Sequence, residues 1–217
     1  MPSKSTMTVR TTIDVNTGGG RSGIFHFVRH GVTEHNLREI RCGGDLDVDM
    51  AELGREQARR AADQLRTMQL DIGLIVSSAL VRTRETARIV SEALAGIPIM
   101  FEPLLNERCL GAWNEQPLAA TEALLRSNVT PPGGEPEDAF MRRIAAALET
   151  LVPSLPARLL VVGSSGVGRA MHTLLGGEGR LRVSNGEIVQ FNIDRNSFAL
   201  TIPQGMPKET SRPTRRG

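Results

Sequence analysis

Short apolar runs alternate with longer segments of helical hydrophobic period along most of this chain, and this alternation restricts the fold more than any other feature. The predicted strands cover residues 24–28, 72–77, 97–101, 159–163, 188–193 and 198–202. The predicted helices cover residues 51–68, 79–94, 135–151 and 166–175. Apolar strands separated by helices favour a mostly parallel sheet with helices on both faces. We therefore expect an α/β fold, with the last two strands forming a hairpin at one edge of the sheet.

The chain has the size of a single domain. Its 217 residues are 40% hydrophobic, which is enough to bury one sizeable core. Residues 1–22 end in a glycine-rich run and show no hydrophobic period, so we expect a flexible leader. Residues 204–217 are polar and basic and contain prolines, which predicts a flexible tail. The predicted domain therefore covers residues 23–203.

Composition argues against several classes of partner. No apolar run is long enough to span a membrane, and no stretch near the start has the form of a signal peptide, so we expect a cytoplasmic protein. The formal net charge of +2 comes from the basic ends, and the remainder is slightly acidic, which gives no reason to expect nucleic-acid binding. Cys42 and Cys109 lack the spacing of a zinc site, and we interpret them as small buried thiols.

Arg29, His30 and Gly31 directly follow the first predicted strand. In an open α/β sheet, ligands bind beyond the carboxyl ends of the strands, where a following helix offers free N–H groups to an anion. An imidazole attacks phosphorus only where several donors offset the negative charge of the phosphoryl oxygens. A histidine beside an arginine at a strand end is therefore a candidate nucleophile for phosphoryl transfer.

Further motifs follow in a fixed order. They are Ser78-Ala79-Leu80-Val81-Arg82-Thr83-Arg84-Glu85-Thr86-Ala87, Leu105-Asn106-Glu107-Arg108 with Gly111-Ala112-Trp113, and Pro132-Gly133-Gly134-Glu135. Together with the first motif, this series resembles the histidine phosphatase superfamily, the phosphoglycerate mutase-like proteins, over residues 24–193. The resemblance implies a three-layer α/β/α sandwich with a mostly parallel central sheet.

The resemblance also assigns roles to single residues. It implies that His30 accepts the phosphoryl group and that Arg29 and Arg82 bind it. Asn36 and Thr33 are implied as further phosphate donors. A guanidinium can bind two phosphate oxygens at once, which fixes their orientation as well as offsetting their charge. The alternative for Arg82 is an ordinary surface position on its predicted helix.

Cleavage of a phosphomonoester also needs a proton for the leaving oxygen and a base that prepares water to cleave the phosphohistidine. Glu107 lies on a loop after the predicted strand of residues 97–101. The resemblance implies that Glu107 is both the general acid and the general base. The alternative is a surface carboxylate without a catalytic role.

The chain departs from the family pattern at its last motif. The family has a strand, then Ser-His-Gly-Gly, then a helix carrying an arginine, and this histidine is its second catalytic one. Here the strand is followed by Gly163-Ser164-Ser165-Gly166-Val167-Gly168-Arg169, with Ser164 at the histidine position. A serine is uncharged and shorter than an imidazole, so we expect weaker transition-state stabilisation. We still place Ser164 and Ser165 at the phosphate, with the N–H groups of Ser165 and Gly166 binding an oxygen at the helix start.

The acidic run from Asp45 to Asp49 has two interpretations. With Glu56 it mimics the spacing of a calcium loop, but Met50 stands where that loop needs glycine. The same run resembles the family's connection into a long helix. We therefore expect it to shape the pocket rim and to cap the helix that begins near Ala51.

These patterns predict a phosphomonoester hydrolase that acts on a small phosphorylated metabolite through phospho-His30, without a cofactor or a metal ion. The alternative is an inactive protein that binds a phosphate ligand, because of Ser164. A phosphoglycerate mutase is less favoured, because the segment of residues 108–131 is shorter than the covering segment of the family's glycolytic mutases. The expected partner is the phosphorylated substrate, and the sequence leaves a homodimer open.

Overall fold

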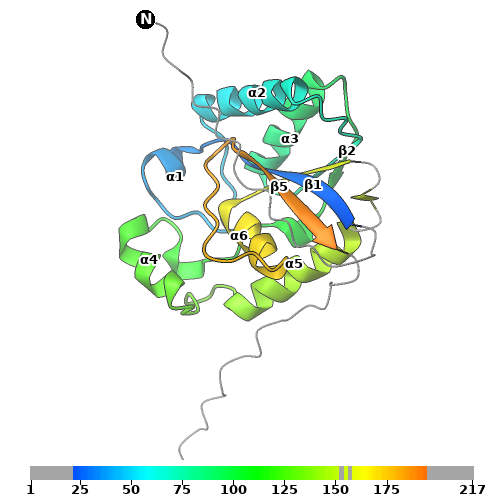
Figure 1. Ribbon diagram of the computed structural model, residues 1–217. Coiled ribbons are helices and arrows are strands. Elements are labelled where there is room, and N and C mark those ends of the chain that lie inside the picture. The colour runs from blue at the N-terminus through cyan, green and yellow to red at the C-terminus, as the bar shows by residue number, and fades with distance from the viewer. Residues whose placement is uncertain (1–21, 152–153, 156–157, 195–217) are drawn as a thin grey trace, which may run out of the picture.

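One five-stranded sheet forms the centre of the computed structural model, which describes residues 22–151, 154–155 and 158–194. Its strands are β1 (Ser22–Arg29), β2 (Leu74–Ser77), β3 (Ile99–Phe101), β4 (Leu159–Gly163) and β5 (Ile188–Asp194). The strand order is β3-β2-β4-β1-β5. Figure 1 shows β5 beside β1. All neighbouring strands are parallel except β5, which runs antiparallel to β1. The predicted mostly parallel sheet is confirmed.

Some predictions lie outside the described residues. These are the strand of residues 198–202 with its hairpin, the tail, and the leader up to residue 21. Strand β1 begins at Ser22, one residue before the predicted start of the domain.

The predicted long helices are present as α2 (Glu52–Thr67), α3 (Val81–Ala93), α5 (Glu137–Leu151) and α6 (Ser165–Leu174). Shorter elements that the sequence did not predict are α1 (Glu34–Leu37), α4 (Leu118–Arg126) and the 3₁₀ turns η1 (Pro103–Leu105) and η2 (Gly111–Trp113). Each of these shorter elements lies in a connection that starts at the carboxyl end of β1 or β3. The irregular structure is thus concentrated at one edge of the sheet.

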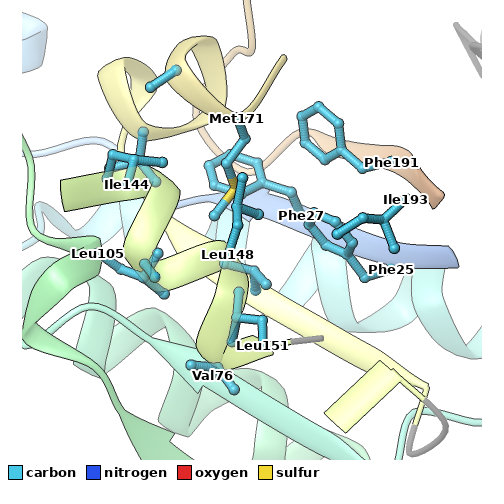
Figure 2. Close-up of a cluster of buried hydrophobic side chains, with 14 of the residues drawn as sticks. Phe25, Phe27, Val76, Leu105, Ile144, Leu148, Leu151, Met171, Phe191 and Ile193 are labelled. Atoms are coloured by element: carbon cyan, nitrogen blue, oxygen red, sulfur yellow. The ribbon is translucent and has the colours of Figure 1, made fainter. Parts of the chain in front are cut away.

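The helices cover both faces of the sheet because alternate strand residues point to opposite sides. On β4, Leu159 and Val161 pack with α5 and α6, whereas Leu160 and Val162 pack with α2 and α3. Figure 2 shows the first of these clusters, in which side chains of β1 and β5 face those of α5 and α6. The molecule is therefore a three-layer α/β/α sandwich, as predicted.

The carboxyl ends of β1, β2 and β4 lie together at one edge of the sheet. Arg29 at the end of β1 pairs with Gly163 at the end of β4, and Ser77 at the end of β2 pairs with Val162. The N–H of His30 extends the pairing of β1 with β4 by donating to the carbonyl oxygen of Gly163 at 3.0 Å. The loops after these strands therefore start side by side, at the edge where ligands bind in α/β sheets.

Candidate active site

A cavity of about 640 Å³ lies at this edge of the sheet. Its walls come from the segments after β1, β3 and β4, from the start of α3, from α4, and from the loop between α6 and β5. Every residue predicted for the site lines it: His30, Glu107, Arg29, Arg82, Asn36, Thr33, Ser164 and Ser165. The structure thus brings all the predicted residues together, while their chemical roles stay predictions.

His30 is held as a neutral imidazole. Its side chain is buried, and this burial, together with the positive charges of Arg82 and Arg29, lowers its pKa well below the ordinary value of 6.5. Its Nδ1 lies 2.8 Å from the carbonyl oxygen of Gly31. Because a carbonyl only accepts hydrogen bonds, Nδ1 carries the proton and Nε2 keeps a free lone pair. This is the form of imidazole that attacks phosphorus.

Two guanidiniums are fixed in the cavity wall by backbone carbonyls. Arg82 is only 2% exposed and donates to the carbonyl oxygens of Leu46 at 3.2 Å and Gly43 at 3.1 Å. Arg29 donates to the carbonyl oxygen of Val183 at 2.9 Å, and its Nε is buried without a hydrogen-bond partner in the described part of the chain. Arg82 is therefore not an ordinary surface residue of α3. Both side chains keep N–H groups for an anion.

Thr33 and Asn36 form the cap of α1. The Oγ1 of Thr33 accepts from the N–H of Asn36 at 3.2 Å, and the N–H of Thr33 donates to Oδ1 of Asn36 at 3.1 Å. Asn185 donates to the same Oδ1 at 3.3 Å and to the carbonyl oxygen of His30 at 2.9 Å. The amide oxygen of Asn36 is therefore occupied, and its Nδ2 is left to face an anion. Sequence analysis missed Asn185, for which the turn dipeptide with Gly186 was the only signal.

The carboxylate of Glu107 lies at the N-terminus of α6. Its Oε2 accepts from the N–H of Gly166 at 2.8 Å, and its Oε1 accepts from the N–H of Arg108 at 2.8 Å. A helix N-terminus favours an anion at this place. The prediction that the N–H of Gly166 binds a phosphate oxygen is therefore wrong. A Cβ at residue 166 would lie 2.0 Å from Oε1 of Glu107, so any other residue here would require this carboxylate to move.

Arg143 on α5 braces the loop that carries Glu107. It donates to the carbonyl oxygens of Leu104 and Asn106, each at 2.8 Å, and forms a 2.7 Å ion pair with Glu135. These contacts fix the backbone directly before the catalytic candidate. Sequence analysis did not single out Arg143, because no signal within α5 marks it.

Ser164 is the N-cap residue of α6 and is 2% exposed. Its side chain makes no capping hydrogen bond, and its Oγ has no partner among the described residues. Buried hydroxyl groups nearly always have a partner, so this oxygen at the cavity wall is a candidate contact for a ligand. Ser165 is the first residue of α6 and lines the same cavity.

The acidic run of residues 45–49 caps a different helix from the one predicted. Both carboxylate oxygens of Asp47 accept from the N–H of Val81, at 2.8 and 3.1 Å, where α3 begins. Helix α2 starts after Ala51 without a side-chain cap. Asp45 accepts from the N–H groups of Leu110 and Gly111, each at 2.8 Å. The run thus caps the start of α3, whose first N–H groups need acceptors. None of residues 45–49 lines the cavity, so the expected part of this run in the pocket rim stays a prediction.

The two cysteines are half-buried rather than buried. This partial burial raises the pKa of both thiols, Cys42 and Cys109.

Within residues 22–151, 154–155 and 158–194, no three or more His, Cys, Asp or Glu side chains form a group that could hold a metal ion. The helices in the same ranges are too short or too polar to cross a membrane.

Comparison with known families gives one match over most of the chain. A family model described as "Histidine phosphatase superfamily (branch 1)" matches residues 25–202. The probable phosphoglycerate mutase GpmB of Enterobacter sp. (strain 638) is 33% identical over 189 residues, which cover 80% of this chain and 86% of that protein. A 2,3-bisphosphoglycerate-dependent phosphoglycerate mutase of Methylobacterium radiotolerans is 33% identical over 168 residues, covering 69% of this chain and 77% of that protein.

Solved structures with the same architecture include phosphatases. A mycobacterial glucosyl-3-phosphoglycerate phosphatase in complex with VO3 matches with a TM-score of 0.65 and 29% identity, covering 77% of this chain and 90% of that chain. A putative alpha-ribazole-5'-P phosphatase of Escherichia coli K-12 matches with a TM-score of 0.66 and 25% identity, covering 80% of this chain and 92% of that chain. The five-stranded, mostly parallel sheet with its covering helices matches the phosphoglycerate mutase-like fold of these neighbours.

Proposed function

The chain belongs to the histidine phosphatase superfamily, and from that premise we propose that it hydrolyses a small phosphorylated metabolite through a phosphohistidine at His30. The observation that carries this proposal is the buried, neutral imidazole of His30, whose Nε2 lone pair is free. It shares one cavity with the fixed guanidiniums of Arg29 and Arg82. A nucleophile and two phosphate-binding cations at one strand end are the main requirements of phosphoryl transfer.

In the first step, Nε2 of His30 attacks phosphorus in line with the leaving oxygen. The N–P bond forms while the P–O bond to the leaving group breaks, and Arg29 and Arg82 offset the charge on the three non-bridging oxygens. The Nδ2 of Asn36 is a further donor. The hydroxyl of Thr33 accepts from Asn36 and keeps its own proton for a phosphoryl oxygen.

Glu107 serves both steps. It gives a proton to the leaving oxygen, so the product alcohol departs neutral. It then takes a proton from water, whose oxygen attacks phosphorus as the bond to His30 breaks, and inorganic phosphate and the free imidazole result. Each carboxylate oxygen accepts one backbone N–H and keeps a second lone pair for this proton.

The reaction needs neither a metal ion nor a cofactor, because arginines supply the charge that a metal would supply elsewhere. Phosphatases among the structural neighbours support hydrolysis, whereas the curated relatives carry the name of mutases. We favour hydrolysis because the segment of residues 108–131 that follows Glu107 is short. The substrate is the expected partner, and nucleic acid is not. We also propose a cytoplasmic location, and the sequence leaves a homodimer open.

An inactive phosphate-binding protein is the second candidate, and Ser164 is the observation that favours it. We propose that Ser164 replaces the second catalytic histidine of the family. Its partnerless Oγ supplies at most one neutral donor where the family has an imidazole. The fold and the arginines would then retain a phosphate ligand without turning it over.

Trapping of the phosphorylated intermediate tests the proposal. Rapid acid and alkaline quenching during turnover of a phosphorylated substrate should reveal an acid-labile, base-stable phosphoryl group on His30. His30→Ala should abolish this label, while His35→Ala, which alters a histidine that does not line the cavity, should retain it. A label on another residue, or full activity of His30→Ala, would overturn the mechanism. Vanadate binding without any label would identify the inactive candidate.

A further inference from the structure

The cavity carries more positive charge than one phosphoryl group can use. Its lining includes eight arginines and two glutamates: Arg29, Arg41, Arg82, Arg108, Arg126, Arg169, Arg180, Arg182, Glu107 and Glu122. Glu137 pairs with Arg108 at 2.5 Å and Asp47 pairs with Arg82 at 3.8 Å, and neither carboxylate lines the cavity. A phosphoryl dianion then offsets two of the four remaining positive charges. Two positive charges stay uncompensated, which makes the cavity attractive to a second anion.

The excess charge comes from other elements than those that carry His30, Arg29 and Arg82. Four arginines form what we call the mouth cluster: Arg126 on α4, Arg169 on α6, and Arg180 and Arg182 on the loop between α6 and β5. Partial desolvation lowers the pKa of Arg180, whose side chain is 38% exposed, and the charges of Arg169, Arg126 and Arg182 lower it further while Glu122 raises it. The charge of Arg169 also lowers the pKa of Arg29. Arg169 is therefore close enough to both Arg29 and Arg180 for their charges to interact.

Among the residues that line the cavity, Glu122 on α4 is the carboxylate that pairs with members of this cluster. It pairs with Arg41 at 2.7 Å, Arg126 at 2.9 Å and Arg180 at 3.2 Å. The hydrogen bond from Arg41, with further help from Arg126 and Arg180, lowers the pKa of Glu122 to about 2. One carboxylate shared among three arginines leaves each of them with N–H donors to spare.

Two members of the cluster, Arg169 and Arg182, have no counter-ion among the described residues. Their guanidiniums form no ion pair and no hydrogen bond in that part of the chain. Both nevertheless line the cavity. The apolar side chains of Leu118 and Leu125 on α4 line the same cavity, so an uncharged part of a ligand has apolar contacts there as well.

We propose that the leaving group of the substrate carries a second oxyanion, a carboxylate or a phosphate, which binds at Arg169, Arg180 and Arg182 while the scissile phosphoryl group lies at His30. This assignment rests on the proposed function, because it takes the His30 side as the phosphoryl end. It narrows the substrate class to phosphomonoesters with two separated anionic groups and excludes simple alcohol or neutral sugar phosphates as preferred substrates.

Two matched ligand pairs test the proposal by isothermal titration calorimetry in His30→Ala, so that nothing is turned over. They are phenyl phosphate against 4-carboxyphenyl phosphate, and glucose 6-phosphate against glucose 1,6-bisphosphate. At about 0.15 M salt, which screens distant charges, the second anion should raise affinity at least about tenfold. The variant Arg180→Gln with Arg182→Gln should lose most of this gain. Arg88→Gln, an exposed change of equal charge on α3, should keep it.

The pair that shows the gain identifies the source of the second anion as carboxylate or phosphate, and a gain in both pairs assigns a general oxyanion site. Equal affinity within both pairs overturns the proposal. A gain that persists in the double variant, or that falls equally in Arg88→Gln, overturns it too, because the effect then belongs to the overall field. Because binding is measured without turnover, the affinities can be interpreted even if no phosphohistidine forms. If the protein turns over a substrate but the affinities within both pairs are equal, the second-anion site is wrong while the proposed function stands.

Discussion

Replacing Ser164 by histidine measures how much transition-state stabilisation is lost with a serine at this position. The Oγ of Ser164 is buried at the cavity wall and has no partner in the described part of the chain. An imidazole there adds an N–H donor toward the phosphoryl oxygens. At the adjoining helix N-terminus, Glu107 already accepts from the N–H of Gly166, so of the two N–H groups considered there the one of Ser165 is left for an oxygen. Losing the imidazole is comparable to losing one oxyanion donor, about 3 kcal/mol or roughly a hundred- to a thousandfold in rate.

We expect Ser164→His to raise kcat/KM for 4-nitrophenyl phosphate at least about tenfold, because imperfect placement of the new ring forfeits part of the gain. The release of nitrophenolate at steady state gives the rate. Ser164→Phe is the matched control, since it adds a ring of similar size without an N–H donor. Overpacking by either ring costs about 1–3 kcal/mol of folding free energy, so the melting temperatures are compared alongside.

Three results would refute this reasoning, each in a different way. Absent hydrolysis in Ser164→His, with vanadate binding unchanged or weaker, would favour the inactive phosphate-binding protein. A natural substrate that the unaltered protein turns over quickly and Ser164→His slowly would show that the serine belongs to an adapted site. An equal gain in Ser164→Phe would assign the effect to filled volume rather than to the donor.

Arg29→Ala and Arg82→Ala should each weaken vanadate binding at least about tenfold by calorimetry, while Arg84→Ala should not; equal losses in all three would indicate a diffuse field. Gly166→Ala should lower kcat at least about tenfold with the circular dichroism spectrum preserved, because its Cβ would lie 2.0 Å from Oε1 of Glu107 and would displace the proposed general acid; unchanged kcat would contradict that role. The acid-side midpoint of the pH profile of kcat/KM should lie below pH 6.5, because the proposed attack needs neutral His30 and its pKa is lowered; a midpoint at or above that value counts against His30. For the same reason, His30 contributes folding stability that is present above pH 6.5 and is lost as the pH falls below it, which urea unfolding at several pH values measures.

The main elements of the fold could be predicted because their signals are local. Strand β4 has the predicted bounds, since its apolar side chains are buried on both faces of a parallel sheet. Helix α4 could not be predicted in the same way, because it is short and exposes several of its apolar residues. It is held by distant contacts: Arg41 donates to Oγ1 of Thr121 at 2.7 Å and to the carbonyl oxygen of Leu118 at 3.2 Å. No short window of sequence contains both sides of that contact.

The site residues also fall into those that a local motif locates and those that depend on distant contacts. His30 and Arg82 stand in motifs directly after strands, so a local pattern was sufficient to locate them. The hydrogen bond from Gly166 to Glu107 joins the loop after β3 to the start of α6, and sequence reasoning gave that N–H to the phosphate instead. Asn185 reaches His30 across 155 residues. Contacts of this kind depend on how the strands are ordered in the sheet, which the pattern of elements leaves undecided.

The pairing of β1 with β4 has a consequence for how activity arises during folding. The loop with His30 comes near the start of the described chain, and its neighbour at Ser164 follows only after β2, β3 and their helices. During synthesis His30 leaves the ribosome well before the loop with Ser164 exists, and a fragment ending before β4 lacks part of the proposed phosphate site. Closing so long a loop is entropically slow compared with forming the helices. Recovery of turnover in a refolding experiment should therefore lag behind recovery of helical signal, which makes hydrolysis a reporter of the finished sheet.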